Sequence, residues 1–374
     1  MKKILYLTFN DAPSGIFSGQ VIDVCLYWKE LGFDVTLVSF ISLRNFKVNK
    51  NKIKNAFPKA IVVPMFPKAR NWRLNSWFLG RKIKKINPEV IVCRGVFATL
   101  LAMEFRSGRK ICFDARGAYE AELNEYDVIP DEKVKSEISK LERKAVLESD
   151  FRLAVSNQLV NYWKDKISYH SDNHVIVPCT LNGKSLIEIT ELKKAEIRKN
   201  LGFTITDTVI VYSGSSAGWQ SLKRLDEAMI PLFDNNAELK LLLLTNEIPN
   251  ELQVLKKYPD RVKSKWLKSD EVGDYLSVCD YGWLVRENTV TNQVASPVKF
   301  AEYLAAGLEV IISENLGDYS KYVIENNVGM ILSSNPSLSK LLKPDLTQKK
   351  RIMELAKKDF LKENYRELYF KLLS

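Results

Sequence analysis

Short apolar runs alternate with helical patterns along this chain of 374 residues. In the first half, apolar runs between polar segments predict strands at 3–9, 34–40, 60–64, 90–93, 110–113 and 151–155. In the second half, similar runs predict strands at 208–212, 239–244, 262–266, 281–285, 310–313 and 329–332. Residues 19–31 and 132–149 show helical periodicity. This alternation predicts α/β architecture with parallel, doubly wound sheets.

Both halves show the same alternation of strands and helices, and the chain is long enough to form two domains with full hydrophobic cores. We expect an N-terminal Rossmann-like domain at 1–177, a polar, helix-prone linker at 178–205, and a second Rossmann-like domain at 206–349. Strong helix formers fill 350–374. The short apolar run at 3–9 ends at Asn10-Asp11, which favours a first strand over a signal peptide.

The stretch Ser296-Pro-Val-Lys-Phe-Ala-Glu-Tyr-Leu-Ala-Ala-Gly307-Leu reads as a helix that begins at an anion site. Ser296 suits the N-cap, Pro297 suits the first helical position, and Gly307 suits the end. Lys299 is unusual in the first turn, where the helix dipole favours acidic residues. An anion such as phosphate, docked on Lys299 and the backbone N–H groups, would explain it.

Glu302 follows Lys299 by three residues, so both side chains share one helix face. A lysine for phosphate and a carboxylate for a sugar diol would together hold a nucleotide. The alternative is a solvated Lys–Glu pair on a surface helix. The flanking strands at 281–285 and 308–313 count against that alternative, because they place the helix in a βαβ unit whose ligand edge faces its N-terminus.

Residues 296–307 resemble the donor-site helix of the GT-B glycosyltransferases, in particular the retaining family 4 (group 1). The resemblance implies two Rossmann-like doubly wound parallel-sheet domains facing a central cleft, with the C-terminal helix (350–374) packing back on the first domain. In that family the glutamate that matches Glu302 holds the ribose of a sugar nucleotide. The resemblance also implies retention of configuration, with the leaving phosphate helping to take the acceptor proton.

The chain departs from the family pattern at two positions. Many members carry a second glutamate eight positions before the ribose glutamate, and Val294 stands there. Either Arg286 and Glu287 replace that role, or the sugar is held otherwise, so retention and inversion both stay open. Glu309 stands where proline is common in the family.

Two further segments of the second half could line a donor site. Residues 209–219 read as a strand and a small-residue loop, with Gly214, Ser215 and Gly218 allowing backbone N–H groups to reach phosphate. The resemblance implies that a basic residue near here contacts the diphosphate, and either Lys223 or Arg224 could do so. Trp266 follows a predicted strand and could lie along the nucleobase or sit in the core.

The first half offers acceptor-side candidates. Residues 15–20, with Gly15 and Gly19, look like a glycine loop that approaches donor phosphate or acceptor, or like an ordinary turn between strand and helix. Asp114, Arg116 and Glu122 follow a strand. A carboxylate there could orient or deprotonate an acceptor hydroxyl, and Arg116 could bind an acidic acceptor. The alternative is a structural Asp114–Arg116 pair.

Arg94 ends the preceding predicted strand and is a weaker candidate of the same kind. With Lys299, we take Asp114 and Arg116 as the candidate catalytic residues.

Positive charge is concentrated in one segment. The formal net charge is +11, and residues 44–87 contain thirteen Lys or Arg and no Asp or Glu. Phe66, Trp72, Trp77 and Phe78 lie among these cations. Such a segment suits an anionic membrane surface or an anionic acceptor. Nucleic-acid binding and a plain solvated surface are the alternatives.

These features predict a glycosyltransferase that moves a sugar from a nucleotide-sugar donor to a hydroxyl of a lipid-linked or surface-polysaccharide acceptor. No Asp-x-Asp motif occurs, so we expect no metal and no cofactor. The five scattered cysteines and the lack of long apolar runs favour a reduced, cytoplasmic protein, peripheral on the inner face of the cell membrane. A sugar-nucleotide 2-epimerase of the same fold and a basic nucleic-acid-binding protein are the alternative functions.

Overall fold

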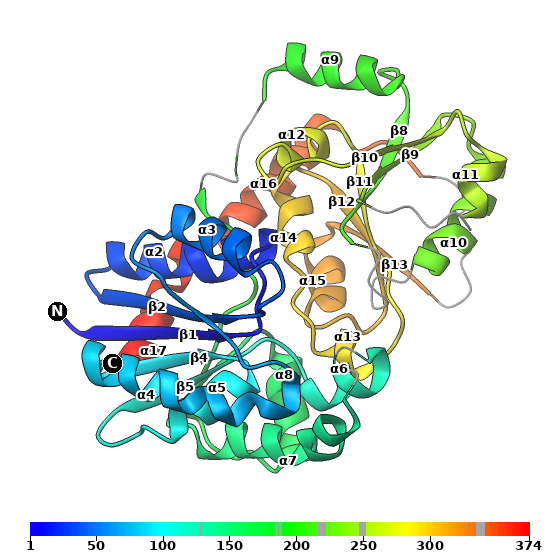
Figure 1. The fold of residues 1–374 in the computed structure, drawn as a ribbon. Coiled ribbons are helices and arrows are strands. Elements are labelled where there is room, and N and C mark those ends of the chain that lie inside the picture. The colour runs from blue at the N-terminus through cyan, green and yellow to red at the C-terminus, as the bar shows by residue number, and fades with distance from the viewer. Residues whose placement is uncertain are drawn as a thin grey trace. The chain divides into compact units, whose positions relative to one another are not determined.

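The computed structural model (Figure 1) describes residues 1–127, 129, 131–183, 186, 189–215, 222–246, 252–333 and 341–374. The chain divides into two compact units. Unit 1 comprises Met1–Thr180, Val294–Ser296 and Lys362–Ser374, and unit 2 comprises Leu181–Gln293 and Pro297–Leu361.

Unit 1 is built on a seven-stranded sheet in the order β3-β2-β1-β4-β5-β6-β7, with every pair parallel. The strands are β1 (Lys3–Phe9), β2 (Asp34–Ile41), β3 (Ile61–Pro64), β4 (Val90–Arg94), β5 (Lys110–Ala115), β6 (Phe151–Ala154) and β7 (His174–Ile176). The helices are α1 (Gly15–Phe17), η1 (Ser18–Ile22), α2 (Asp23–Glu30), α3 (Phe46–Ala56), η2 (Ala69–Asn75), α4 (Ser76–Ile86), α5 (Val96–Met103), α6 (Tyr119–Tyr126), α7 (Glu132–Glu148), α8 (Asn157–Tyr162), η3 (Trp163–Ile167), η6 (Lys362–Tyr365) and α17 (Arg366–Leu373).

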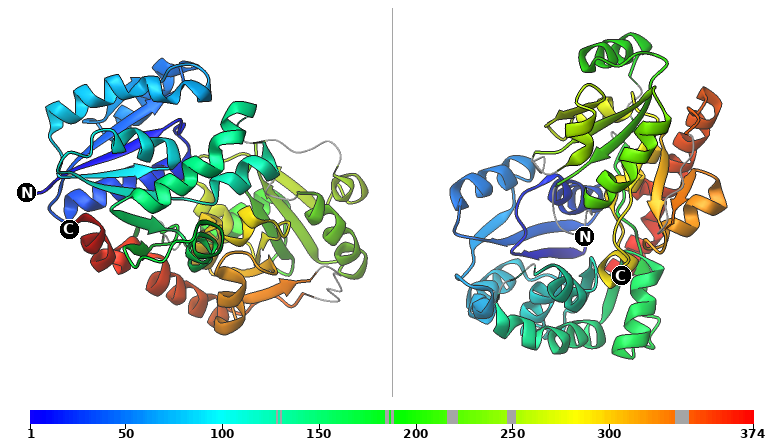
Figure 2. Two further views of the ribbon diagram at one scale, coloured as in Figure 1. Left: turned by 90° about the horizontal axis from the view of Figure 1, so that it is seen from below. Right: turned by 90° about the vertical axis from the view of Figure 1, so that its right-hand side faces the viewer.

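The C-terminal helix completes the core of unit 1. Tyr369, Leu372 and Leu373 of α17 belong to the same buried cluster as Tyr6 and Trp28. Both termini lie close together (Figure 2), where Lys2 Nζ donates a hydrogen bond to the Ser374 carbonyl oxygen. Parallel strands covered on both faces account for the nearly continuous apolar sequence of β1 and β4.

Unit 2 has a six-stranded parallel sheet in the order β10-β9-β8-β11-β12-β13. The strands are β8 (Thr208–Ser213), β9 (Leu239–Leu244), β10 (Val262–Lys265), β11 (Tyr281–Leu284), β12 (Glu309–Ser313) and β13 (Gly329–Leu332). The helices are α9 (Glu191–Leu201), α10 (Leu222–Asn235), α11 (Gln253–Lys257), α12 (Val272–Leu276), α13 (Val290–Gln293), α14 (Val298–Ala305), α15 (Tyr319–Asn326) and α16 (Leu346–Phe360). The chain moves outward from β8 in one direction and from β11 in the other, so the switch point lies between them. Ligands bind at the carboxyl ends of the strands at such a point.

The predicted fold class is confirmed, because both units are parallel sheets with alternating helices. Each of the predicted strands is present within one or two residues at either end, and among the described residues the short edge strand β7 was not predicted. The C-terminal segment differs from the expected single helix at 350–374. It contains the end of α16, which lies in unit 2, followed by η6 and α17 in unit 1. The expected linker at 178–205 contains helix α9 of unit 2.

All five cysteines are buried and free. Within the described ranges, no helix is both long enough and apolar enough to cross a membrane.

Candidate functional site

Helix α14 begins later than its sequence suggests. Its N-cap is Pro297, which makes no side-chain cap bond, and the predicted Ser296 cap is wrong. The Ser296 hydroxyl instead accepts a hydrogen bond from the Cys179 backbone N–H at 2.8 Å. A tertiary contact therefore overrides the local preference. The predicted end at Gly307 is confirmed: its φ is +76°, and Leu308 N–H bonds to the Tyr303 carbonyl in a Schellman motif.

Lys299 lies against the end of strand β8. Its side chain is buried, and its Nζ is 4.7 Å from the centre of the Tyr212 ring. Gly214 follows β8 with a φ of +148°, and a Cβ atom on it would lie 1.9 Å from Lys299 Nζ. Glycine at this position therefore both permits the backbone conformation and leaves room for the ammonium group.

Arg286 follows strand β11 and is also buried. Its Nη1 donates to Asn292 Oδ1 at 3.3 Å, and its backbone N–H donates to Ser313 Oγ at 3.2 Å. Its carbonyl oxygen accepts a hydrogen bond from Arg224 Nη1 at 2.9 Å. Lys223 is instead exposed and pairs with Glu227 on α10. Of the two basic residues considered in the sequence, Arg224 is the one beside Arg286.

Tyr303 fixes α14 at the switch point. The paired residues of β8 and β11 are Ile210–Tyr281 and Val211–Gly282. Just beyond them, the Tyr303 hydroxyl accepts from Ser213 N–H at 3.0 Å and donates to the Trp283 carbonyl at 3.3 Å. A Cβ atom on Gly282 would lie 2.2 Å from the Tyr303 ring, so this glycine makes room for the tyrosine. The helix that carries Lys299 and Glu302 is thereby held in the gap between the two strands.

The electrostatics of this cluster favour an anionic ligand. Burial and the nearby Arg286 guanidinium lower the pKa of the Lys299 ammonium well below its usual value, against the opposing Glu302 charge. Burial raises the pKa of Glu302, against the attraction of Lys299. An anionic ligand such as a diphosphate would favour the charged form of Lys299.

Glu302 is partly exposed beside these cations. Among the residues that the structure describes, none donates a hydrogen bond to its carboxylate. It can therefore accept hydrogen bonds from the hydroxyl groups of a ligand.

The other residues that the sequence proposed for the donor side differ in exposure and placement. Glu287 and Ser215 are exposed, and the Ser215 carbonyl accepts from the Tyr212 hydroxyl at 2.5 Å. Gly218 lies outside the described residues. Val294, at the position of the missing glutamate, is buried in unit 1. Trp266 is 68% exposed at the end of β10, so the core alternative for it is wrong.

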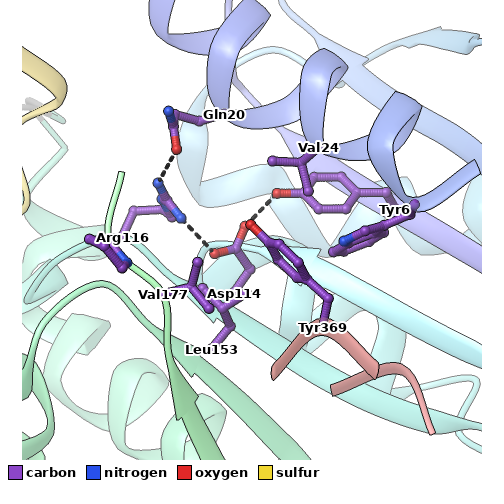
Figure 3. A pocket seen from close by; sticks show the side chains of 10 residues that line it. Tyr6, Gln20, Val24, Asp114, Arg116, Leu153, Val177 and Tyr369 are labelled. Carbon is purple, nitrogen blue, oxygen red and sulfur yellow. Dashed lines mark hydrogen bonds and ion pairs between the residues drawn. The ribbon is translucent and has the colours of Figure 1, made fainter. Parts of the chain in front are cut away.

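In unit 1, Asp114 lies at the end of β5 and is enclosed by partners (Figure 3). It accepts a hydrogen bond from the Tyr6 hydroxyl and pairs with Arg116 at 3.2 Å and Arg94 at 3.7 Å. The cavity beside it, lined by Tyr369 among others, has a volume of about 10 Å³ and has room for a single water molecule at most. Asp114 and Arg116 thus form the ion pair that the structural alternative describes.

Arg116 connects Asp114 to the residues just before the chain first passes into unit 2 at Leu181. Its Nη2 lies 3.2 Å from Gln20 Oε1 and 3.1 Å from Cys179 Sγ (Figure 3 shows the Gln20 bond). Gln20 Nε2 in turn donates to the Thr180 carbonyl at 2.8 Å.

The predicted glycine loop is helical. Gly15 opens α1, which Ser14 caps by accepting from Phe17 N–H, and Gly19 lies in the wide turn η1. A Cβ atom on either glycine would meet nothing within 4 Å. Both glycines therefore border open space.

Glu122 is the acceptor-side carboxylate that the sequence proposed on the segment after β5. It is partly exposed on α6, and a Cβ atom on Gly117 would lie 2.2 Å from its Oε1. Burial and the like charge of Glu125 raise its pKa to about 7, with Arg94 opposing. Within the described ranges, no group donates a hydrogen bond to the Glu122 carboxylate. Arg94 itself is held by Asp11 at 2.7 Å.

Metal-ligating side chains do not gather in the part of the chain that the structure describes: no group of three or more His, Cys, Asp or Glu could hold an ion there.

No protein-family model and no curated protein sequence matches this chain. Solved structures do match it along its whole length. Anabaena Alr3699/HepE in complex with UDP and glucose has a TM-score of 0.71 at 14% identity, covering 99% of each chain. A glycosyltransferase from Rickettsia africae has a TM-score of 0.71 at 18% identity, covering 100% of this chain and 99% of that one.

WaaG, a glycosyltransferase of lipopolysaccharide biosynthesis, has a TM-score of 0.64 at 15% identity, covering 98% and 94%. The fold is therefore GT-B, as the sequence predicted.

Proposed function

We propose that this protein is a glycosyltransferase that binds a nucleotide-sugar donor on unit 2 and transfers the sugar to an acceptor hydroxyl. One observation carries the proposal. Buried Lys299 and Arg286 come together with the available carboxylate of Glu302 at the switch point of the second sheet. The GT-B fold supports it, since HepE, with the same fold, was solved with UDP.

The donor would be held by charge and by hydrogen bonds. Lys299 and Arg286 bind the diphosphate, and Glu302 accepts hydrogen bonds from the two ribose hydroxyls. Trp266 offers an exposed aromatic face at the same edge of the sheet for the base. In the reaction, the bond between the anomeric carbon and the phosphate oxygen breaks, and that carbon joins the acceptor oxygen. The nucleoside diphosphate leaves with the electron pair, and the two cations stabilise its growing charge.

Retention of configuration, as the sequence resemblance implies, belongs to this proposal. The departing phosphate oxygen then takes the acceptor proton. Lys299 and Arg286 supply the positive charge that this leaving group requires, which supports a metal-independent reaction. Glu122 accepts a hydrogen bond from the acceptor and orients it.

The acceptor in this proposal is a lipid-linked or anionic glycan at an anionic membrane surface, and the protein works on the cytoplasmic face. The basic segment 44–87 supports this, because it exposes Leu74 and Trp77 and stacks Arg81 over the Trp77 ring at 3.7 Å. Exposed apolar groups beside cations suit a lipid interface. WaaG, a structural neighbour, takes part in lipopolysaccharide biosynthesis.

A thermal-shift panel with UDP, GDP, ADP, CDP, dTDP and CMP tests the donor site. We expect one diphosphate to raise the melting temperature clearly, which also names the base. Its nucleotide sugars are then incubated with the protein and lipid extract, and transfer is followed by mass spectrometry. Conversion of the nucleotide sugar to an isomer without any acceptor would favour the 2-epimerase alternative instead.

Vesicle sedimentation tests the membrane part separately. The protein should pellet with phosphatidylglycerol vesicles more than with phosphatidylcholine vesicles, and less at high salt. Trp77→Ala with Arg81→Ala should reduce pelleting, whereas Leu192→Ala, a change at an 85% exposed apolar residue of unit 2, should not. Equal pelleting with both lipids would count against this surface.

A further inference from the structure

The segment Val294–Ser296 has an unexpected place in the molecule. It lies in sequence between α13 and α14, both of unit 2, yet it belongs to unit 1. Along the chain, these three residues lie between Arg286 and Lys299, both of which belong to unit 2. We call these three residues the strap.

Two buried hydrogen bonds hold the strap within unit 1. The Ser156 hydroxyl donates to the Val294 carbonyl at 2.7 Å. At the other end, the Cys179 backbone N–H donates to Ser296 Oγ at 2.8 Å. Val294, Ser296 and Ser156 are all buried, so water does not compete for these bonds.

The elements on either side of the strap carry the anion site. Asn292, two residues before it, accepts the hydrogen bond from the Arg286 guanidinium. Lys299 comes three residues after Ser296, in the first turn of α14. A displacement of the strap would therefore shift the supports of both cations.

The Cys179 end of the strap is itself anchored. Arg116 contacts Cys179 Sγ, and Gln20 holds the next carbonyl, that of Thr180. Leu181 then belongs to unit 2. The strap is thus bonded to the last residues of unit 1 before the chain first passes into unit 2.

We infer that Ser156 and Ser296 are positioning residues for the anion site, and that the strap couples a ligand at Lys299 and Arg286 to the Cys179 hydrogen bond. This inference rests on the proposed function for the nature of that ligand. Ser296 acts through the Cys179 backbone, so the donor-binding role considered for it in the sequence becomes an indirect one.

Hydrogen exchange on the full-length protein tests the coupling, with UDP and inorganic pyrophosphate as probes. In the wild-type protein, either probe should slow exchange in α14 and also at the Cys179 amide, the latter by about tenfold, the scale of one strengthened hydrogen bond. In Ser296→Ala, the Cys179 amide should exchange fast with or without a probe, and protection of α14 should require a higher probe concentration, because the anion site has lost a positioning residue. Ser296→Thr keeps the hydroxyl and should restore the response.

Ser149→Ala is the matched control, because it removes another buried serine hydroxyl bond of unit 1, to the Ala145 carbonyl, without touching the strap. It should leave the response of the Cys179 amide intact. Slower exchange in α14 with no change at Cys179 in the wild-type protein would overturn the coupling and leave the anion site standing. No slowing in α14 with either probe would overturn the anion site, and the inference with it.

Discussion

Both sheets have charged side chains near the carboxyl ends of their strands, but the surroundings of these charged groups differ. In unit 1, the Asp114 carboxylate is surrounded by Tyr6, Arg94 and Arg116. In unit 2, burial and, after it, the positive charge of Arg286 lower the pKa of Lys299.

This difference suggests how to distinguish charged residues that stabilise the fold from charged residues that bind a ligand. A buried charge with its partners in place contributes to the fold, and breaking such a pair is costly. A buried cation whose charged form is disfavoured costs free energy in the unliganded protein, and an anionic ligand recovers part of it. By this criterion we propose the cations of unit 2 as the donor side of the reaction and a structural role for Asp114.

The largest effect should come from Asp114→Asn. It would leave the mostly buried side chains of Arg94 and Arg116 beside a neutral side chain, and we expect the free energy of unfolding to fall by about 3–5 kcal/mol in urea titrations. Asp11→Asn is the matched control, since Asp11 pairs with the same Arg94 but its side chain is 37% exposed. The control should lose less than about 1 kcal/mol. Equal losses in the two variants would contradict a structural role for Asp114.

Lys299→Met should have a small effect on stability and a large effect on ligand affinity, the reverse of Asp114→Asn. It removes a desolvated cation, so the free energy of unfolding without ligand should change by less than about 1 kcal/mol. Affinity for the nucleoside diphosphate, measured by calorimetry, should fall about 100-fold, because a charged hydrogen bond is worth roughly 1.5–3 kcal/mol. Lys223→Met, at an exposed lysine of the neighbouring helix α10, should leave affinity unchanged. Full affinity in Lys299→Met would remove Lys299 from the site.

Glu302→Ala sharpens the comparison within unit 2. If its carboxylate holds the ribose, affinity for the nucleoside diphosphate should fall about tenfold, the scale of one lost charged hydrogen bond. Affinity for inorganic pyrophosphate, which has no ribose, should stay the same or rise as a negative charge is removed. A loss of pyrophosphate binding equal to that of the nucleotide would instead place Glu302 in the support of the cations.

A pH series should show the smallest effect. The pKa of Lys299 is lowered in the free protein, and a bound diphosphate would raise it again. Binding therefore takes up protons, and affinity should decrease as pH rises through the lowered pKa. Calorimetry in buffers of different ionisation enthalpy measures that uptake, and Lys299→Met should abolish it. Release of protons on binding would contradict the expected rise in the pKa of Lys299 when the diphosphate binds.

Local sequence patterns were sufficient for most of the fold. Buried parallel strands are continuous apolar runs, so β1, β9 and β13 could be placed to the residue. Strand β7 was missed because it has only three residues, at the edge of its sheet, and begins with a histidine. The end of α14 was also predictable, because a glycine with positive φ is a local requirement.

Predictions failed where a tertiary contact decides. Ser296 has the sequence of an N-cap, but the Cys179 N–H, distant in sequence, takes its hydroxyl. The glycines at 15 and 19 suggested a loop, but the Ser14 cap and the packing of the following turn make the segment helical.

The candidate site could be predicted only in part. The spacing of Lys299 and Glu302 follows from the helix period, so their shared face could be seen in the sequence. The placement of Arg286 and Lys299 depends on the Tyr303 hydroxyl, which bonds to the ends of both β8 and β11. No local sequence pattern predicts this contact. The same holds for Asp114 at the end of β5 and Glu122 on α6: only the packing shows which of the two carboxylates already has its hydrogen-bond and ion-pair partners.

A crystal structure with the nucleoside diphosphate that stabilises the protein most is the most direct test of the central claim. The account predicts phosphate oxygens within hydrogen-bond distance of Lys299 Nζ and the Arg286 guanidinium, with the ribose hydroxyls on Glu302. Density for the nucleotide anywhere else, with Lys299 and Glu302 left in contact with solvent, would contradict it.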